Sequence, residues 1–185
     1  MAELASGDAP GMAGLPLAVG GATLAALPEA AMAEILPFRD GAAAVAAALG
    51  AALPAPGRAT ALGDGSTLAW LGLDRWLLRG PAAAGLAGRL GGAAAVIDQS
   101  DGWIALSLAG PAAAGVLARL LPLDLAPEAF PPDAACRSAL RHVPCLVLGA
   151  AAGFGILAPR SYGASVISEL AEAMRSVAAR AAIGG

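Results

Sequence analysis

The sequence of 185 residues contains no lysine and no asparagine. Without lysine the chain has no Schiff-base residue, no phosphate-loop lysine and no lysine general base. Without asparagine it has no N-glycosylation site. All 11 basic residues are arginines spread along the chain, and the net charge is −3 at pH 7. Because nucleic-acid-binding domains concentrate basic residues on one face, we expect no nucleic-acid partner.

Long, strongly apolar segments are also missing. The uncharged stretches 9–28, 41–57 and 143–159 each contain proline and several small residues, whereas a membrane-spanning helix needs about 20 predominantly apolar residues. No basic segment precedes the first apolar residues, so the pattern does not indicate a secretory signal. We therefore expect a cytoplasmic protein that is not embedded in a membrane.

Cysteine is scarce, because Cys136 and Cys145 are the only two and cannot build a disulfide framework. With His142 they form the pattern C-x5-H-x2-C, which offers three metal ligands. Structural zinc sites usually have four ligands, commonly in C-x2-C pairs. Pro144, between His142 and Cys145, also indicates the start of a strand. We expect free thiols and no metal on this chain.

Residues 1–33 are rich in glycine, alanine and proline and show no clear hydrophobic period, so we predict a flexible N-terminal arm. One domain is predicted over residues 34–185. Strands are predicted over residues 35–39, 68–71, 75–79, 94–98, 103–108, 145–148 and 154–157. Helices are predicted over residues 41–53 and 166–180, and after Gly80-Pro81 and Gly110-Pro111. Hairpins alternating with helices predict an α+β fold.

The polar segment Asp98-Gln99-Ser100-Asp101-Gly102-Trp103 interrupts two apolar runs. It predicts a hairpin whose strands, 94–98 and 103–108, are joined by a tight turn at Asp101-Gly102. In the second strand one face is apolar and the other is mixed, with Ile104, Leu106 and Leu108 on the first and Trp103, Ala105 and Ser107 on the second.

Two segments of the chain resemble each other. Residues 79–90 read R-G-P-A-A-A-G-L-A-G-R-L, and residues 109–120 read A-G-P-A-A-A-G-V-L-A-R-L. Proline is favoured at the first position of a helix, because its missing N–H is one that the helix would leave unpaired. The match therefore predicts a repeated strand-then-helix unit.

Two catalytic motifs match only in part. Residues 153–158, G-F-G-I-L-A, fit the dinucleotide fingerprint G-x-G-x-x-A, yet Pro159 follows where the motif requires a helix. Residues 98–102 fit half of a nucleophile elbow, but its first glycine is missing and a strand follows. We expect instead that Asp98, Ser100 and Asp101 cap the turn through its backbone amides.

Several sequence blocks, in consistent order between residues 35 and 182, resemble the sarcosine oxidase gamma subunit family. Residues 68–78, L-A-W-L-G-L-D-R-W-L-L, are similar to its W-L-G-P-D-E-W-L-L, and residues 98–110 to its D-Q-S-D-G-W and S-G-P. Pro-Leu-Asp-Leu at 122–125, Phe-Pro at 130–131 and Arg160-Ser161 also match. Leu73 and Arg75 depart from the pattern, where the family has proline and an acidic residue.

The resemblance implies the fold of the aminomethyltransferase folate-binding domain. It implies a gamma subunit that assembles with alpha, beta and delta subunits into a heterotetrameric flavoenzyme. That enzyme oxidatively demethylates sarcosine to glycine, passes the one-carbon unit to tetrahydrofolate or releases formaldehyde, and produces hydrogen peroxide. FAD, FMN and NAD belong to the larger subunits and zinc to the smallest. This chain itself is therefore expected to be non-catalytic and to hold no cofactor.

Two alternatives remain open. In the first alternative, the chain is a gamma-type subunit of a related N-methyl amino acid dehydrogenase. In the second, it is a free-standing folate-binding, aminomethyltransferase-like protein.

Aromatic residues dominate the cores of protein interfaces, which makes the tryptophans the first candidates for binding partners. Arg160 and Ser161 contact an anion or a partner subunit, or else Ser161 caps the last helix and Arg160 is solvated. The predicted partner-binding residues are Trp70, Trp76, Trp103, Asp98, Gln99 and Arg160.

Overall fold

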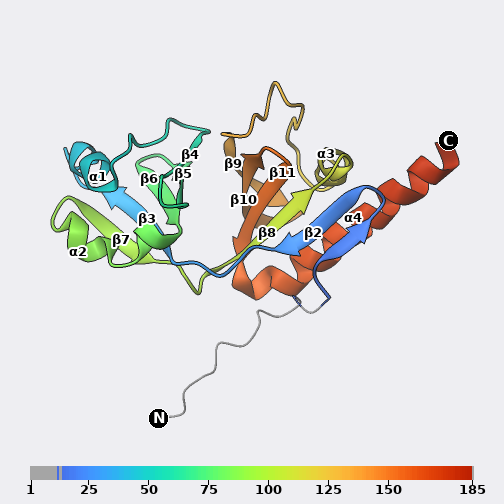
Figure 1. Ribbon diagram of the computed structural model, residues 1–185, viewed down its shortest axis with the longest axis horizontal. Helices are drawn as coiled ribbons and strands as arrows, with labels where there is room; N and C mark the ends of the chain where they lie inside the picture. The colour runs from blue at the N-terminus through green and yellow to red at the C-terminus, as the bar shows by residue number, and fades with distance from the viewer. Residues whose placement is uncertain (1–11, 13, 185) are drawn as a thin grey trace, which may run out of the picture.

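Alternating apolar and polar residues form two antiparallel sheets in the computed structural model, which describes residue 12 and residues 14–184 (Figure 1). The six-stranded sheet contains, in spatial order, β1 (Leu17–Val19), β2 (Ala22–Ala26), β8 (Trp103–Ala109), β11 (Gly153–Pro159), β10 (Val143–Ala150) and β9 (Ala135–Leu140). The five-stranded sheet contains β4 (Ala59–Ala61), β5 (Thr67–Gly72), β6 (Arg75–Arg79), β3 (Met32–Pro37) and β7 (Ala94–Asp98). The predicted α+β fold is confirmed.

Each sheet carries its own helices, and the two units lie side by side in Figure 1. Lobe A is the six-stranded sheet with α3 (Ala113–Leu117), the 3-10 turn η2 (Arg160–Tyr162) and α4 (Gly163–Gly184). Lobe B is the five-stranded sheet with α1 (Ala42–Leu49), the 3-10 turn η1 (Pro81–Ala83) and α2 (Leu86–Leu90). No helix in the described part of the chain is both long and apolar enough to cross a membrane.

The alternation of side chains along each strand creates separate cores on the two faces of each sheet. In β8, Ile104, Leu106 and Leu108 face α3 and α4 in the core of lobe A. Ala105, from the opposite face, joins an inter-sheet core with Leu77 and Leu157. The predicted division of this strand into an apolar and a mixed face is confirmed.

The last helix follows its prediction closely. Val166, Leu170 and Met174 are buried in the core of lobe A, and Ile167 and Val177 pack against it. Their spacing places them on one side of a helix. The hairpins formed by β5 and β6 and by β10 and β11 are also confirmed.

The prediction of a hairpin over residues 94–108 is wrong. β7 pairs with β3 in lobe B, whereas β8 pairs with β2 and β11 in lobe A. The polar segment between them is therefore a crossing from one lobe to the other. A tight turn and a crossing share the same local residue types, so the local sequence did not distinguish them.

The predicted flexible arm over residues 1–33 lies partly outside the described residues, since residues 1–11 and 13 are not described. Within the described part, β1 and β2 pair with each other, and β2 pairs with β8. Leu24 is fully buried against this sheet. The prediction is wrong for these residues, because a hairpin of mostly small residues still buries Ala22 and Leu24.

Both Gly-Pro pairs end a strand and precede helical residues, as the sequence repeat predicts. Gly80 has φ 124° and Gly110 has φ 105°, values that favour glycine. A Cβ atom would lie 2.7 Å from Ser66 Cα at Gly80 and 2.4 Å from the Gly21 carbonyl oxygen at Gly110. The repeated glycines thus have the same local cause, a backbone with positive φ packed closely against a residue that precedes a neighbouring strand.

Candidate functional site

Two chain segments cross between the lobes, and the second is bonded to Met32, the residue that directly follows the first. Residues 27–31 lead from β2 to β3, and residues 99–102 lead from β7 to β8. The N–H of Met32 donates to Ser100 Oγ at 3.0 Å. The N–H of Gln99 donates to the carbonyl oxygen of Met32 at 2.8 Å. The two crossings therefore form one seam between the lobes.

The polar residues of the second crossing also hold their own turn. Asp98 Oδ1 accepts hydrogen bonds from the Ser100 N–H at 2.9 Å and from Ser100 Oγ at 2.7 Å. These hydrogen bonds hold the pKa of Asp98 below its ordinary value. A Cβ at Gly102 would lie 2.6 Å from Gln99 Oε1. The predicted capping role is confirmed for Asp98.

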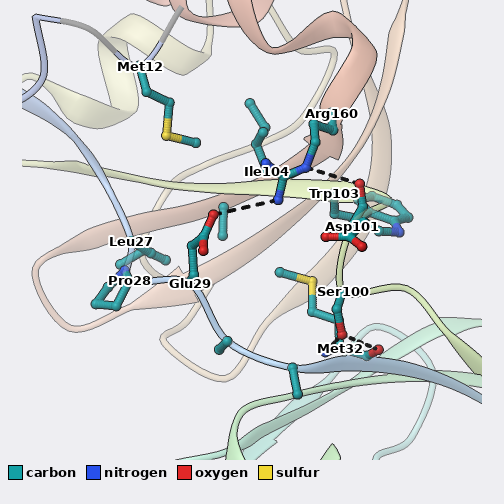
Figure 2. Close-up of a pocket in the computed structure, with 13 residues that line it drawn as sticks. Met12, Leu27, Pro28, Glu29, Met32, Ser100, Asp101, Trp103, Ile104 and Arg160 are labelled. Carbon is teal, nitrogen blue, oxygen red and sulfur yellow. Dashed lines mark hydrogen bonds and ion pairs between the residues drawn. The ribbon is translucent and has the colours of Figure 1, made fainter. Parts of the chain in front are cut away.

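Arg160, just after β11, adds a third connection. Its Nε donates to the carbonyl oxygen of Asp101 at 3.0 Å, and its backbone N–H donates to that of Gly102 at 2.9 Å. Its guanidinium also lies 4.0 Å from Glu29 on the first crossing (Figure 2). Arg160 is therefore bound to both crossings, and the interpretation of a simply solvated side chain is wrong. Ser161 is exposed in η2.

A cleft of about 340 Å³ lies between the crossings (Figure 2). Its apolar wall includes Met12, Leu27, Met32, Trp103, Ile104 and Ala105, and its polar wall includes Glu29, Ser100, Asp101 and Arg160. Ser100 and Arg160 are already engaged in joining the crossings. The hydrogen bonds of Ser100 and Arg160 at this cleft are suited to fixing the relative position of the lobes.

The predicted site residues do not all gather in one place. Trp103 packs against the inter-sheet core and lines the cleft, close to Arg160. Trp70 and Trp76 face each other in register on the β5–β6 hairpin of lobe B. The Nε1 of Trp76 donates to the carbonyl oxygen of Pro54 at 3.0 Å, and the ring packs against the lobe B core. Thus Asp98, Gln99, Trp103 and Arg160 belong to the seam, and the other two tryptophans do not.

The ion pair between Glu34 and Arg75 was not predicted from the sequence. Glu34 is 5% exposed in the middle of β3, and Arg75 forms a salt bridge with it from β6. The indication was a single carboxylate within the apolar run Met-Ala-Glu-Ile-Leu. Arg75 stands where the sarcosine oxidase gamma subunit pattern has an acidic residue. Here it has a buried partner of opposite charge, Glu34.

Arg79 was also missed, although it supports the first crossing. Its guanidinium donates to the carbonyl oxygen of Pro28, and the N–H of Gly80 donates to that of Ala31 at 2.9 Å. Burial lowers the pKa of Arg79. Residues 27–31 are therefore held from lobe B by Arg79 and from lobe A by Arg160.

The cysteine and glycine motifs occupy ordinary positions in sheets. Cys136 is half-buried and Cys145 is buried, both as free thiols, and burial raises the pKa of Cys145 to about 11. His142 is exposed in the turn between β9 and β10. Within the described residues, no group of three or more His, Cys, Asp or Glu side chains could hold a metal ion. Gly153–Pro159 is strand β11, so the G-x-G-x-x-A match does not open a helix and offers no dinucleotide cradle.

No family model matches the chain. A solved structure of glycine cleavage system aminomethyltransferase T from Bartonella henselae matches with a TM-score of 0.61 and 19% identity, over 82% of this chain and 46% of that chain. This likeness concerns the fold alone. The chain is an α+β protein with the two-sheet fold of aminomethyltransferase T.

A chain in the structure of heterotetrameric sarcosine oxidase from Corynebacterium sp. U-96, solved with pyrrole 2-carboxylate, matches with a TM-score of 0.78 and 32% identity over 88% of both chains. The protein belongs to the sarcosine oxidase gamma subunit family. Sarcosine oxidase subunit gamma of Arthrobacter sp. is 40% identical over 118 residues, and that of Corynebacterium sp. strain P-1 is 36% identical over 118 residues. These alignments span 60% of this chain and 58% of each relative.

Proposed function

We propose that this chain is the gamma subunit of a heterotetrameric sarcosine oxidase and that its role there is structural. The observation that carries the proposal is the match to a chain of the Corynebacterium enzyme over 88% of both chains. The complex oxidatively demethylates sarcosine to glycine, with formaldehyde or methylene-tetrahydrofolate and hydrogen peroxide as further products. The chain contacts alpha, beta and delta subunits.

The geometry of the seam supports a structural role. The polar side chains that gather there, Asp98, Ser100 and Arg160, bond to the turn or to the crossings. They hold two lobes in one orientation, which gives partner subunits a fixed surface. FAD, FMN, NAD and zinc are assigned by this proposal to the other subunits.

The proposal is tested by purifying the tagged chain from its native cell and reading the protein composition, the flavin absorbance and the sarcosine activity of the eluate. We expect a yellow complex that contains two larger flavin subunits and one very small zinc subunit. With sarcosine, this complex should release peroxide. Reduction of a separate acceptor without peroxide would favour the related N-methyl amino acid dehydrogenase. A colourless single protein would contradict the proposal, and tetrahydrofolate binding to it would favour a free-standing folate protein.

Trp103 tests the interface more directly. Trp103→Ala removes a half-buried ring at the seam, and interface tryptophans typically contribute about 2 kcal/mol or more to binding. We expect Trp103→Ala to weaken assembly more than it lowers the free energy of unfolding of the isolated chain. Trp103→Phe, which keeps an aromatic ring, is the matched control. Unfolding of the isolated Trp103→Ala chain would show instead that Trp103 belongs to the core.

A further inference from the structure

The strands of the five-stranded sheet have the same arrangement as five of the strands in the six-stranded sheet. Spatial order β9-β10-β11-β8-β2 in lobe A corresponds to β4-β5-β6-β3-β7 in lobe B, and all neighbours are antiparallel. In both lobes a helix follows the fourth strand of this order, and another follows the third. Lobe A has one strand more, because β1 pairs with the outer edge of β2. In the described part of the chain, no strand occupies the corresponding place beside β7.

The hydrogen bonds at both ends of β7 show which backbone groups face this edge. The N–H of Phe38 donates to the carbonyl oxygen of Ala93 at 2.9 Å, and the N–H of Gln99 donates to that of Met32 at 2.8 Å. In an antiparallel pair, the residues that bond to a given neighbour alternate along the strand. Odd-numbered residues of β7 therefore bond to β3. Ala94, Val96 and Asp98 direct their N–H and carbonyl groups to the outer edge.

β7 is a short edge strand that ends in one charged residue, Asp98. β7 reads Ala-Ala-Val-Ile-Asp, without the proline or lysine that commonly guards exposed edges. Ile97 is 46% exposed, and Phe38, beside the start of β7, is 53% exposed. A cleft of about 190 Å³ between α2 and β7, lined in part by Leu86, Ala87 and Val96, offers room for an apolar side chain.

We propose that the outer edge of β7 binds an extended segment of another subunit, which adds to the sheet as an antiparallel strand. β1 shows the arrangement, since it covers the equivalent edge of β2. This inference rests on the proposed function, because the occupant belongs to the same complex. The occupant is recognised by backbone hydrogen bonds and by an apolar side chain opposite the cleft.

Another subunit of the complex suits this edge better than a second copy of the chain, because the solved structure that the chain matches is a heterotetramer. A ladder along the 5 residues of β7 is small beside the roughly 1,000 Å² that a stable specific interface buries. The pairing therefore needs a partner that also covers neighbouring surface. The exposed Phe38 and Ile97 extend the apolar area at the two ends of β7.

Hydrogen exchange of the isolated chain and of the purified complex tests this inference. We expect the amides of Ala94, Val96 and Asp98 to exchange at least about a hundredfold more slowly in the complex, because added strand hydrogen bonds protect them. The amides of Ala95 and Ile97, bonded to β3, serve as internal references. Equal exchange of the outward amides in a complex of proven composition would overturn the inference and leave the proposed function standing.

Other outcomes are also decisive. Protection of the outward amides already in the isolated chain would overturn the inference, because residues of the same chain or a second copy would then cover β7. If the chain enters no complex, the proposed function fails and this inference fails with it.

Val96→Pro removes an outward N–H without removing a bond to β3, since proline is tolerated on an edge strand whose N–H faces out. We expect it to weaken binding to the other subunits by roughly tenfold or more, because one ladder hydrogen bond is lost and the ring obstructs the partner strand. Val96→Ala is the matched control for lost packing. Ile97→Lys, at an exposed position, gives a second variant that needs no backbone change. Binding equal to that of Val96→Ala by both Val96→Pro and Ile97→Lys would overturn the inference.

Discussion

Lobe A and lobe B share a strand order but differ in how they are stabilised. In lobe A, α4 of 22 residues covers a sheet whose side chains Leu24, Leu106 and Leu108 are fully buried. In lobe B, α1 and α2 have 8 and 5 residues, well below the roughly 12–15 residues at which isolated helices become marginally stable. The helices of lobe B therefore depend on packing against their own sheet, where Val45, Leu86 and Leu90 are buried.

Large hydrophobic side chains are exposed in both lobes. Phe38, Leu73 and Ile97 of lobe B are 53%, 85% and 46% exposed, and Tyr162 and Ile183 of lobe A are 44% and 86% exposed. In lobe B, Phe38 and Ile97 lie near the two ends of β7. The comparison teaches that the same strand order can be covered by one long helix in one lobe and by two short helices in the other.

The largest predicted difference between the lobes is the loss of stability when a core leucine is truncated. Leu106→Ala in lobe A and Leu78→Ala in lobe B each empty a fully buried site. We expect losses of about 4 kcal/mol for Leu106→Ala and about 2.5 kcal/mol for Leu78→Ala, because the smaller, alanine-rich core of lobe B collapses more readily around a cavity. Urea unfolding measures both. Equal losses would show that the two cores are equally rigid.

Arg75→Ala leaves the carboxylate of Glu34 buried without its cation. We expect a loss of about 2 kcal/mol in the free energy of unfolding, less than for a fully buried pair because Arg75 is partly exposed. Arg39→Ala, at an exposed position, is the matched control. Adding Glu34→Gln to Arg75→Ala should recover part of the loss, since the buried group is then neutral. No recovery would mean that Arg75 acts through packing alone.

Ser100→Ala removes the acceptor of the Met32 N–H between the two crossings. We expect a loss of about 1 kcal/mol in stability and faster exchange of the Met32 amide. The pKa of Asp98 should rise toward its ordinary value of 3.8, because the hydroxyl no longer stabilises the carboxylate. Titration by NMR measures this shift. Ser107→Ala, whose hydroxyl lies 3.5 Å from the Ala25 carbonyl oxygen, is the control and should leave Asp98 unchanged.

The lowered pKa also predicts the direction of a pH effect. The folded protein holds Asp98 ionised at a pH where the unfolded chain binds a proton, so this contribution to stability is present above pH 3.8 and is lost at lower pH. Ser100→Ala should flatten this acid dependence. An unchanged acid limb of the stability profile would contradict the role of Ser100.

Cys145 reports on lobe A alone, and only at alkaline pH. Its pKa is about 11 in the folded protein against 9.0 ordinarily, so the unfolded chain releases the proton first as the pH rises. Stability should therefore fall between pH 9 and about 11. Cys145→Ala should reduce this decline, measured by denaturant unfolding across that range. Cys136→Ala should reduce the decline less, because Cys136 is only half-buried, although burial raises the pKa of its thiol as well.

Local patterns predicted the parts of this fold that local chemistry determines. The apolar stripe from Val166 to Val177 predicted α4. The turn residues after Leu71 and Leu148 predicted hairpins, and each turn joins two paired strands. The strand β9 was missed because Ala-Cys-Arg-Ser-Ala-Leu mixes polar and small residues. β1 and β2 were missed because glycine and alanine obscure their alternation.

The candidate site was predictable only in its local half. Asp98, Ser100 and Asp101 were expected to cap their own turn, and Asp98 does so, whereas the Ser100 hydroxyl bonds to Asp98 and to the N–H of Met32. Their role between the lobes depends on Met32, which lies 68 residues before Ser100. No spacing rule connects such distant residues. The same is true of Glu34 and Arg75, whose strands become neighbours only in the assembled sheet.

β2 lies near the start of the chain but pairs with β8, and this separation has a consequence for folding during synthesis. Lobe B is built from one continuous segment between β3 and β7, so all of its strands are available before β8 has been made. In lobe A, Leu24 pairs with Leu108, and the covering helix is the last element of the chain. Because domains fold as their residues leave the ribosome, lobe B, with its shorter helices, is complete first. The N-terminal hairpin must wait, its apolar side chains uncovered, for strands made much later.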